Sequence, residues 1–211
     1  MKIEFVSDVA CPWCAIGLNA LERALATIGD DIAVELSFQP FELNPDMGPE
    51  GQDTIAYLSA KYGRTPEQIR QTQAMIRERG AAVGFAFGAR ERVWNTFDAH
   101  RLLCWAEGEG AAQQRALKHA LLQAYHGDGR NPGDREVLLD LCGRVGLDVA
   151  RVCAILDGDD YAQAVREREE FWRRAGIDSV PAVVIDRKHL ISGGQPPEVF
   201  EQALRQMAAA F

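Results

Sequence analysis

The two cysteines of Cys11-Pro12-Trp13-Cys14 are the residues whose types and spacing could best do chemistry. A CxxC pair at the start of a helix places the first sulfur beside unpaired backbone N–H groups and the positive end of the helix dipole, which stabilise a thiolate. Cys14 follows about one helical turn later, where it can attack a mixed disulfide formed on Cys11. The pair therefore predicts thiol-disulfide exchange with Cys11 as the nucleophile, Pro12 in the first helical turn and Trp13 as an apolar platform for substrate.

A single CxxC also has other interpretations. It could be half of a zinc site, but structural zinc needs four ligands, and the sequence offers no second CxxC and no close pair of histidines. We therefore predict no metal site. The two cysteines could also be inert and simply pack in the interior.

The three other cysteines each lie within an apolar segment of helical character: Cys104, Cys142 and Cys153. Buried free cysteine is common, so we expect these three to pack rather than to react. A bridge between Cys142 and Cys153 stays open, because adjacent antiparallel helices could bring them together.

Composition excludes several classes of protein. The chain has 211 residues, of which 47% are hydrophobic, so it can build a core and is not disordered. Its 31 acidic and 23 basic residues give a net charge of -8, which argues against a nucleic-acid partner. The longest apolar runs, such as 180–185, fall far short of the ~20 residues that cross a bilayer. Glu4 and Asp8 interrupt the only candidate signal segment, and the cysteine count is odd, so we expect no membrane association and a cytoplasmic location.

Periodicity predicts the elements that position the cysteines. Residues 1–7 form a short apolar strand, residues 14–28 have a helical apolar face, and residues 32–38 alternate as a second strand. This β-α-β unit requires a parallel pair of strands. Residues 53–157 then show helical patterns only, apart from an ambiguous stretch at 83–87.

The sheet pattern returns near the end of the chain. A charged helix over 161–175 precedes strands at 182–185 and 189–191, whose short polar link demands an antiparallel hairpin, and a last helix covers about 197–207. We predict an α/β, thioredoxin-like fold of order β-α-β, α-β-β-α with an all-helical insertion. The predicted thioredoxin-like domain is discontinuous, covering 1–52 and 158–211, and the insertion of about 100 residues covers 53–157.

With these elements in order, the whole chain resembles the DsbA-like branch of the thioredoxin superfamily, and within it the FrnE-like thiol-disulfide oxidoreductases. The resemblance rests on four ordered motifs: Ser7-Asp8-Val9-Ala10-Cys11-Pro12-Trp13-Cys14, Phe41-Glu42-Leu43-Asn44-Pro45, Asn95-Thr96 with Ala99-His100-Arg101, and Gly193-Gly194-Gln195-Pro196-Pro197. It implies a DsbA-family protein disulfide oxidoreductase that exchanges a Cys11–Cys14 dithiol or disulfide with protein or small-thiol substrates.

The resemblance also implies roles for single residues. Val180-Pro181 corresponds to the cis-proline loop that faces the CxxC and leaves a backbone edge free for substrate. Glu4 corresponds to the acidic residue of the first strand that assists proton transfer at the second cysteine, although seven positions separate it from Cys11, one more than the family spacing; a solvent-exposed edge Glu is the alternative. His100 either borders the active-site groove or is a hydrogen-bonded core residue. The expected substrate-binding residues are Pro12, Trp13, Val180, Pro181, Asn95, His100 and Gln195.

Related families leave a second function open. Kappa-class glutathione transferases and chromene-carboxylate isomerases are similar in architecture but resemble a form with Ser at the position of Cys11, so a glutathione-dependent transferase or isomerase is the alternative. A non-catalytic interaction protein is a third class. We expect no resident cofactor, with glutathione as a candidate redox partner, and the sequence leaves a monomer or a homodimer open.

Overall fold

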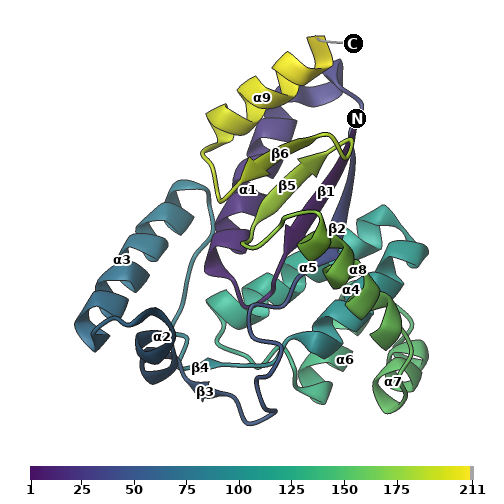
Figure 1. Cartoon of the computed structure of the whole chain (residues 1–211). Coiled ribbons are helices and arrows are strands. Elements are labelled where there is room, and N and C mark those ends of the chain that lie inside the picture. Colours follow the sequence, from purple (N-terminus) through teal and green to yellow (C-terminus); the bar gives the residue numbers. More distant parts are fainter. Residues whose placement is uncertain (210–211) are drawn as a thin grey trace.

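A four-stranded mixed sheet is the centre of the computed structural model, which describes residues 1–209 (Figure 1). Its strands are β1 (Lys2–Ser7), β2 (Glu35–Pro40), β5 (Ala182–Ile185) and β6 (His189–Ser192), in the order β2-β1-β5-β6. β1 runs parallel to β2 and antiparallel to β5, and β5 pairs antiparallel with β6. The parallel pair needs a crossover, which α1 (Pro12–Ile28) and the short 3-10 turn Gly29–Asp31 provide.

The two faces of the sheet pack against different helices. Ile3 and Phe5 of β1 belong to a hydrophobic core with α1 and with α9 (Pro197–Ala209). Val6 points to the other face, where it packs with Trp172 of α8 (Ala162–Arg174). Successive side chains of a strand alternate between faces, so the position of a residue along β1 decides whether it meets α1 or α8.

Between β2 and α8 the chain is mainly helical. Its helices are α2 (Thr54–Tyr62), α3 (Pro66–Ala82), α4 (Phe97–Glu109), α5 (Ala111–Leu122), a π-helical turn (Gln123–Gly127), α6 (Arg135–Arg144) and α7 (Val149–Asp157). Helices α4 to α7 enclose a second hydrophobic core, which also includes Val9 and Ala10 from the loop before Cys11. The loop that carries the cysteine pair is therefore clamped between the two cores.

Side-chain caps begin several of these helices. Asp53 accepts a hydrogen bond from the Ala56 N–H at 2.8 Å, and Thr65 forms a capping box with Gln68. Asp134 and Asp148 cap α6 and α7 in the same way. The α/β fold with a helical insertion is confirmed.

Three details differ from the prediction. The insertion is not entirely helical, because β3 (Gln52–Asp53) pairs antiparallel with β4 (Arg92–Val93). Strands of two residues are too short to show an alternating pattern. The ambiguous stretch 83–87 forms no strand, and its buried side chains join the first core. β2 begins at Glu35 rather than residue 32, since the 3-10 turn places residues 32–34 outside the ladder.

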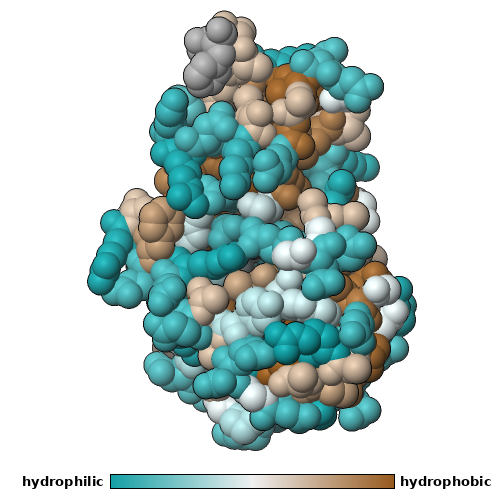
Figure 2. Space-filling view, turned by 90° about the vertical axis from the view of Figure 1, so that its right-hand side faces the viewer, coloured by the Kyte–Doolittle hydropathy of each residue, from teal (hydrophilic) through white to brown (hydrophobic). Residues whose placement is uncertain are grey.

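Hydrophilic side chains cover most of the face shown in Figure 2, and hydrophobic atoms form separate areas between them. Among residues 1–209, no helix has the length and apolar character needed to span a membrane.

Candidate active site

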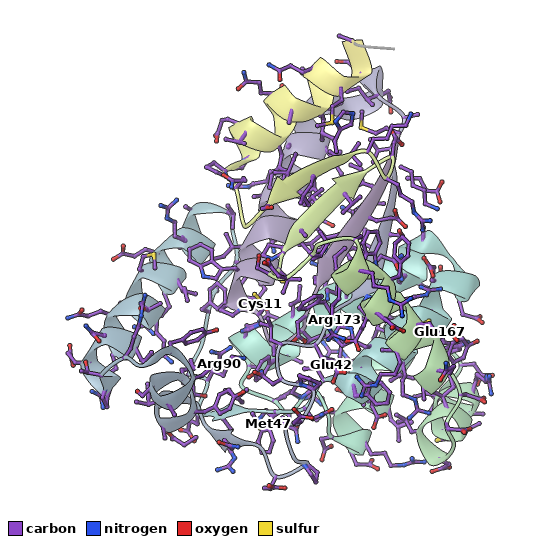
Figure 3. The ribbon with its side chains drawn as sticks, in the orientation of Figure 1. Cys11, Glu42, Met47, Arg90, Glu167 and Arg173 are labelled. Carbon is purple, nitrogen blue, oxygen red and sulfur yellow. The ribbon has the colours of Figure 1, made fainter. Side chains whose placement is uncertain are left out.

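Cys11 is the N-cap residue of α1 and precedes Pro12 at the first helical position. Its backbone is extended, and the Cys14 N–H donates to the Cys11 carbonyl at 3.0 Å. Figure 3 shows Cys11 below the sheet, between the α2–α3 pair and the α4–α8 pair, with Arg90 and Glu42 on either side. The helix N-terminus therefore presents its positive end to the Cys11 sulfur.

The environments of the two thiols separate their acidities. A hydrogen bond from the Cys14 thiol lowers the pKa of Cys11, and this outweighs the opposing effect of burial. Burial raises the pKa of Cys14 well above its usual value, and the hydrogen bond to Cys11 adds to the increase. Cys11 is thus the better nucleophile of the pair, and Cys14 is a buried thiol that must be deprotonated before it can react.

The loop before β5 contacts the cysteine pair. The Val180–Pro181 peptide bond is cis, and the Cys11 thiol donates to the Val180 carbonyl at 3.5 Å. Gly17 of α1 lies directly under Pro181, because a Cβ added to Gly17 would come within 3.0 Å of the Pro181 Cγ and 3.3 Å of the Gly194 Cα. Close packing of α1 on this loop therefore fixes the distance between Cys11 and Val180.

A cleft of about 670 Å³ opens in front of Cys11. Its walls include Pro12, Trp13 and Val180, together with apolar residues of the 41–43 loop, α2 and α3. Three cationic side chains also line it: Lys61, Arg64 and Arg90. Two acidic side chains, Glu42 and Asp178, line it as well, so the cleft combines apolar walls with charges of both signs.

Lys61 and Arg90 are positioned by hydrogen bonds to the loops of the site. Lys61 Nζ donates to the Leu43 carbonyl at 2.9 Å, and Arg90 Nη1 donates to the Ala10 carbonyl at 3.2 Å. Burial lowers the pKa of Lys61, while the charges of Asp8 and Cys11 oppose that effect. The Lys61 amine is therefore close enough to respond to the charge on Cys11.

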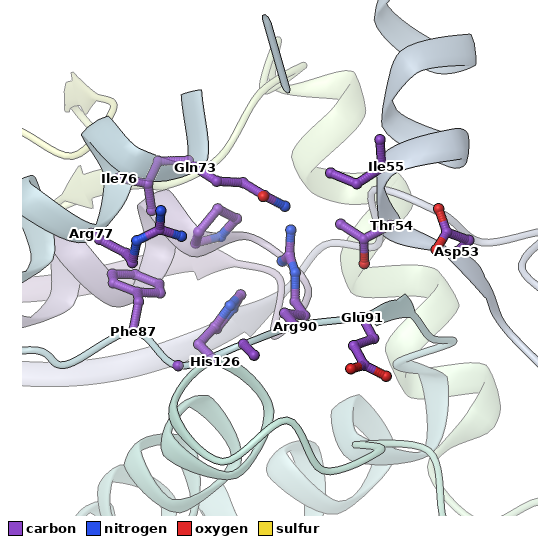
Figure 4. A pocket seen from close by; sticks show the side chains of 13 residues that line it. Asp53, Thr54, Ile55, Gln73, Ile76, Arg77, Phe87, Arg90, Glu91 and His126 are labelled. Carbon is purple, nitrogen blue, oxygen red and sulfur yellow. The ribbon is translucent and has the colours of Figure 1, made fainter. Parts of the chain in front are cut away.

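A second cavity of about 410 Å³ adjoins this cleft (Figure 4). Pro12, Gln73, Ile76 and Arg90 line both. Figure 4 shows Gln73 and Ile76 entering from α3 on one side and Arg90 and His126 from the other. Arg90 thus stands between the two cavities.

Asp8 is the centre of a buried polar network directly before the cysteines. Its side chain is fully buried and accepts hydrogen bonds from the Thr96 hydroxyl at 2.8 Å, from the Ala10 N–H at 3.0 Å and from the Leu43 N–H at 2.8 Å. His100 Nε2 lies 3.2 Å from the same carboxylate. Burial is the largest single effect on the pKa of Asp8 and raises it. The interactions with His100 and with the backbone N–H groups of Leu43 and Ala10 together outweigh burial, so the pKa lies below its usual value.

The network decides between the two predictions for His100. Its side chain is 1% exposed and bonds to Asp8, so it is a hydrogen-bonded core residue that supports the loop before Cys11. The sequence analysis assigned Asp8 no role. Its position, as a polar residue between an apolar strand and a CxxC, is the signal that could have indicated one.

Glu4 does not lie near the cysteine pair. It is buried on the sheet face that packs against α8 and forms an ion pair with Arg187, at 2.9 Å between Oε1 and Nη2. The cysteines lie on the opposite side, with Phe5 rather than Glu4 facing α1. Because side chains alternate along a strand, the one extra position between Glu4 and Cys11 reverses the face. The structure therefore corrects the prediction that Glu4 assists proton transfer at Cys14.

Asn95 and Gln195 hold loops in place. Asn95 donates to the Met47 carbonyl at 3.0 Å and accepts from the Phe97 N–H at the start of α4. Gln195 donates to the Ser192 carbonyl at 2.7 Å. Within the described residues, neither lines the cleft in front of Cys11, and their predicted contacts with substrate stay predictions.

Cys104 and Cys142 are buried, and Cys153 is partly exposed; like the cysteine pair, all three are free thiols. Burial raises the pKa of Cys142 to about 12. The residues that the structure describes contain no cluster of three or more His, Cys, Asp or Glu side chains arranged to hold a metal ion.

Comparison with known proteins places this geometry in a family. The sequence profile of the DSBA-like thioredoxin domain matches residues 2–205. The crystal structure of the probable DsbA oxidoreductase SCO1869 from Streptomyces coelicolor is similar with a TM-score of 0.91 and 38% identity, over 98% of this chain and 89% of that one. The uncharacterized protein YwbO of Bacillus subtilis is 29% identical over 212 residues, which cover 97% of this chain and 96% of YwbO.

A more distant structure shares the fold. The cytosolic disulfide reductase DsbM from Pseudomonas aeruginosa, solved with GSH, has a TM-score of 0.69 and 18% identity over 99% of this chain and 100% of that one. The profile match over nearly the whole length, together with the likeness to SCO1869, shows that the chain belongs to the DSBA-like thioredoxin domain family.

Proposed function

We propose that the chain is a thiol-disulfide oxidoreductase in which Cys11 attacks the substrate and Cys14 resolves the mixed disulfide. The observation that carries this assignment is the difference between the two thiols. Both side chains are largely buried, at 4% and 0% exposed, but Cys11 lines the cleft at a helix N-terminus and has a lowered pKa, whereas Cys14 does not line the cleft and has a raised one. Only the first can meet a substrate as a thiolate.

Reduction of a substrate disulfide proceeds in two steps. The Cys11 thiolate attacks one substrate sulfur, the substrate S–S bond breaks, and the first substrate thiolate leaves. It takes up from solvent the proton that Cys11 released when it ionised. Cys14 then loses its proton and attacks the Cys11 sulfur; the Cys11–substrate bond breaks, and the second thiol leaves with a proton. The protein ends as the Cys11–Cys14 disulfide, and the reverse sequence oxidises a dithiol substrate.

The cleft supports binding of small thiols as well as extended peptides. The Val180 carbonyl beside Cys11 supplies a backbone edge for a peptide, and Trp13 offers an apolar surface. The cations Lys61, Arg64 and Arg90 suit the carboxylates of glutathione, which we propose as a redox partner. DsbM, which shares the fold, was solved with GSH.

We also propose a cytoplasmic location, in keeping with the cytosolic DsbM. Cell fractionation with an antibody against the chain tests this directly. Light scattering of the purified protein decides between a monomer and a homodimer.

Insulin reduction by single-cysteine variants tests the assignment of the two thiols. Cys11→Ser is expected to abolish turnover, while Cys14→Ser keeps one reactive thiol and accumulates mixed disulfides. Full turnover by Cys11→Ser would contradict the proposal. The glutathione transferase alternative would instead gain support from conjugation of chlorodinitrobenzene that survives Cys11→Ser.

A further inference from the structure

Lys118 is a fully buried lysine that the exchange mechanism has not used. It belongs to α5 and is 1% exposed. Lysine is almost never buried to this extent unless it is paired. Among residues 1–209, however, Lys118 forms no ion pair with a carboxylate. A buried cation in such a place needs another source of stabilisation, and that source indicates its role.

The contacts of α5 direct Lys118 toward the core that contains the cysteine pair. Leu122, one turn after Lys118 on α5, belongs to the same core as Cys11 and Cys14. Residues four apart share a face of a helix, so Lys118 faces this core as well. On another part of α5, Arg115 and His119 pair with Glu22 of α1 at 2.6 Å and 2.8 Å.

The opposite side of Lys118 faces the end of β2. Gln114, one turn earlier on α5, bonds to both the N–H and the carbonyl of Phe38 at 3.1 Å. Lys118 lines a small void with Pro40 and His100, and His100 in turn bonds to Asp8. The lysine is thus enclosed by the elements that carry the cysteines and the Asp8 network.

The titratable groups around Lys118 come from α1 and the loop before it, from α4 and from the π-helical turn. They are Asp8 from the loop before the cysteines, Cys11 and Cys14 from the start of α1, His100 and Cys104 from α4, and His126 from the π-helical turn. Burial lowers the pKa of Lys118, and the charge of Cys14 opposes this most strongly, followed by those of Asp8 and Cys11. Reciprocally, the charge of Lys118 opposes the rise in the pKa of Cys14.

We propose that Lys118 is the buried cation that favours the Cys14 thiolate when Cys14 attacks the mixed disulfide on Cys11. It is a positioning residue that acts through Cys14. This is the role that the family resemblance had implied for Glu4. The proton that Cys14 loses ends on the released substrate thiol, so the overall step stays balanced. The inference rests on the proposed function, because it concerns the second step of that reaction.

Stopped-flow reaction with Ellman's reagent resolves the two steps. Attack by Cys11 releases the first thionitrobenzoate, and attack by Cys14 on the mixed disulfide releases the second. Cys14→Ser identifies the first phase. Lys118→Met keeps the length of the side chain and removes the charge, and Arg115→Met removes a more exposed cation from the same helix as the matched control.

At pH 7 we expect Lys118→Met to slow the second phase about tenfold, since one unit of pKa lowers the thiolate fraction about tenfold. The pH profile of that phase moves to higher pH, while the first phase changes less and Arg115→Met resembles the wild type. An unchanged second phase in a folded Lys118→Met protein would overturn the role of Lys118. Loss of the first phase in the wild type would instead contradict the proposed function.

A measurement that keeps Lys118 covers the case in which Lys118→Met does not fold. NMR of ¹³Cε-labelled lysine gives the pKa of the Lys118 amine in the reduced Cys11→Ser protein, in which Cys14 is the remaining thiol of the pair, and in the protein with both Cys11→Ser and Cys14→Ser. The proposal requires a higher value in the first protein, because only there can a Cys14 thiolate stabilise the ammonium. Equal values in the two proteins would overturn it.

Discussion

Replacing Gly17 with Ala tests how α1 positions the cis-proline loop. The new Cβ would lie 3.0 Å from the Pro181 Cγ and 3.3 Å from the Gly194 Cα. Carbon atoms in contact usually lie ~3.5–4.0 Å apart. Overpacking of this kind costs about 1–3 kcal/mol, whereas Ala in place of Gly within a helix gains up to about 1 kcal/mol. Gly17→Ala should therefore lower the free energy of unfolding by about 0–2 kcal/mol.

Gly108 of α4 provides the matched control, because a Cβ there would meet nothing within 4 Å. Gly108→Ala has a similar helix-propensity term without the clash, so the difference between the two variants isolates the contact with Pro181. Urea denaturation should give a difference of about 1–3 kcal/mol in unfolding free energy. Equal unfolding free energies for the two variants would refute the close packing of α1 on Pro181.

The displacement of Pro181 should also change the rate of thiol-disulfide exchange. Val180 precedes Pro181 and accepts the hydrogen bond of the Cys11 thiol. We expect Gly17→Ala to slow insulin reduction at a temperature where the variant is folded, and Gly108→Ala to leave the rate unchanged.

Three further predictions concern acidity and packing. Burial raises the pKa of Glu42, so its folded-state pKa exceeds the unfolded value and its contribution to stability is lost as pH rises through the folded value. In urea denaturation between pH 4 and 7, Glu42→Gln should gain stability relative to the wild type as pH rises; a parallel pH profile would contradict this. Cys142→Ala should cost ~1 kcal/mol of stability without loss of insulin reduction, which a folded but inactive variant would disprove. Trp13→His should lower the pKa of Cys11 in a thiolate absorbance titration and make the potential less negative within about -270 to -120 mV; an unchanged pKa would refute it.

Local signals in the sequence were sufficient for the elements around the cysteine pair. Pro12 and the apolar period predicted α1, and the three-residue polar link at 186–188 predicted the hairpin that the structure shows. Asp53 and Thr65, which cap α2 and α3, are local signals of the same kind. These features depend on neighbours in the chain, which is why a single sequence reveals them.

The remaining features depend on which segments meet in space. Glu4 has the carboxylate that the predicted role needs. Side chains alternate along β1, however, and Glu4 points to the face of the sheet opposite the cysteines. No local pattern in the sequence singles out Lys118 or Arg90, because only the packing of α5 and of the 88–91 loop brings them to the site. Asp8 gained its network from Leu43, Thr96 and His100, which come from distant parts of the chain.

The most direct test of the central claim is to locate the mixed disulfide that forms with glutathione disulfide. The Cys14→Ser variant is treated with glutathione disulfide at neutral pH, quenched with acid, digested and mapped by mass spectrometry. The mechanism predicts glutathione on Cys11, because Cys11 lines the cleft and its pKa is lowered. Glutathione on Cys104, Cys142 or Cys153 with Cys11 left free would contradict the assignment of Cys11 as the nucleophile.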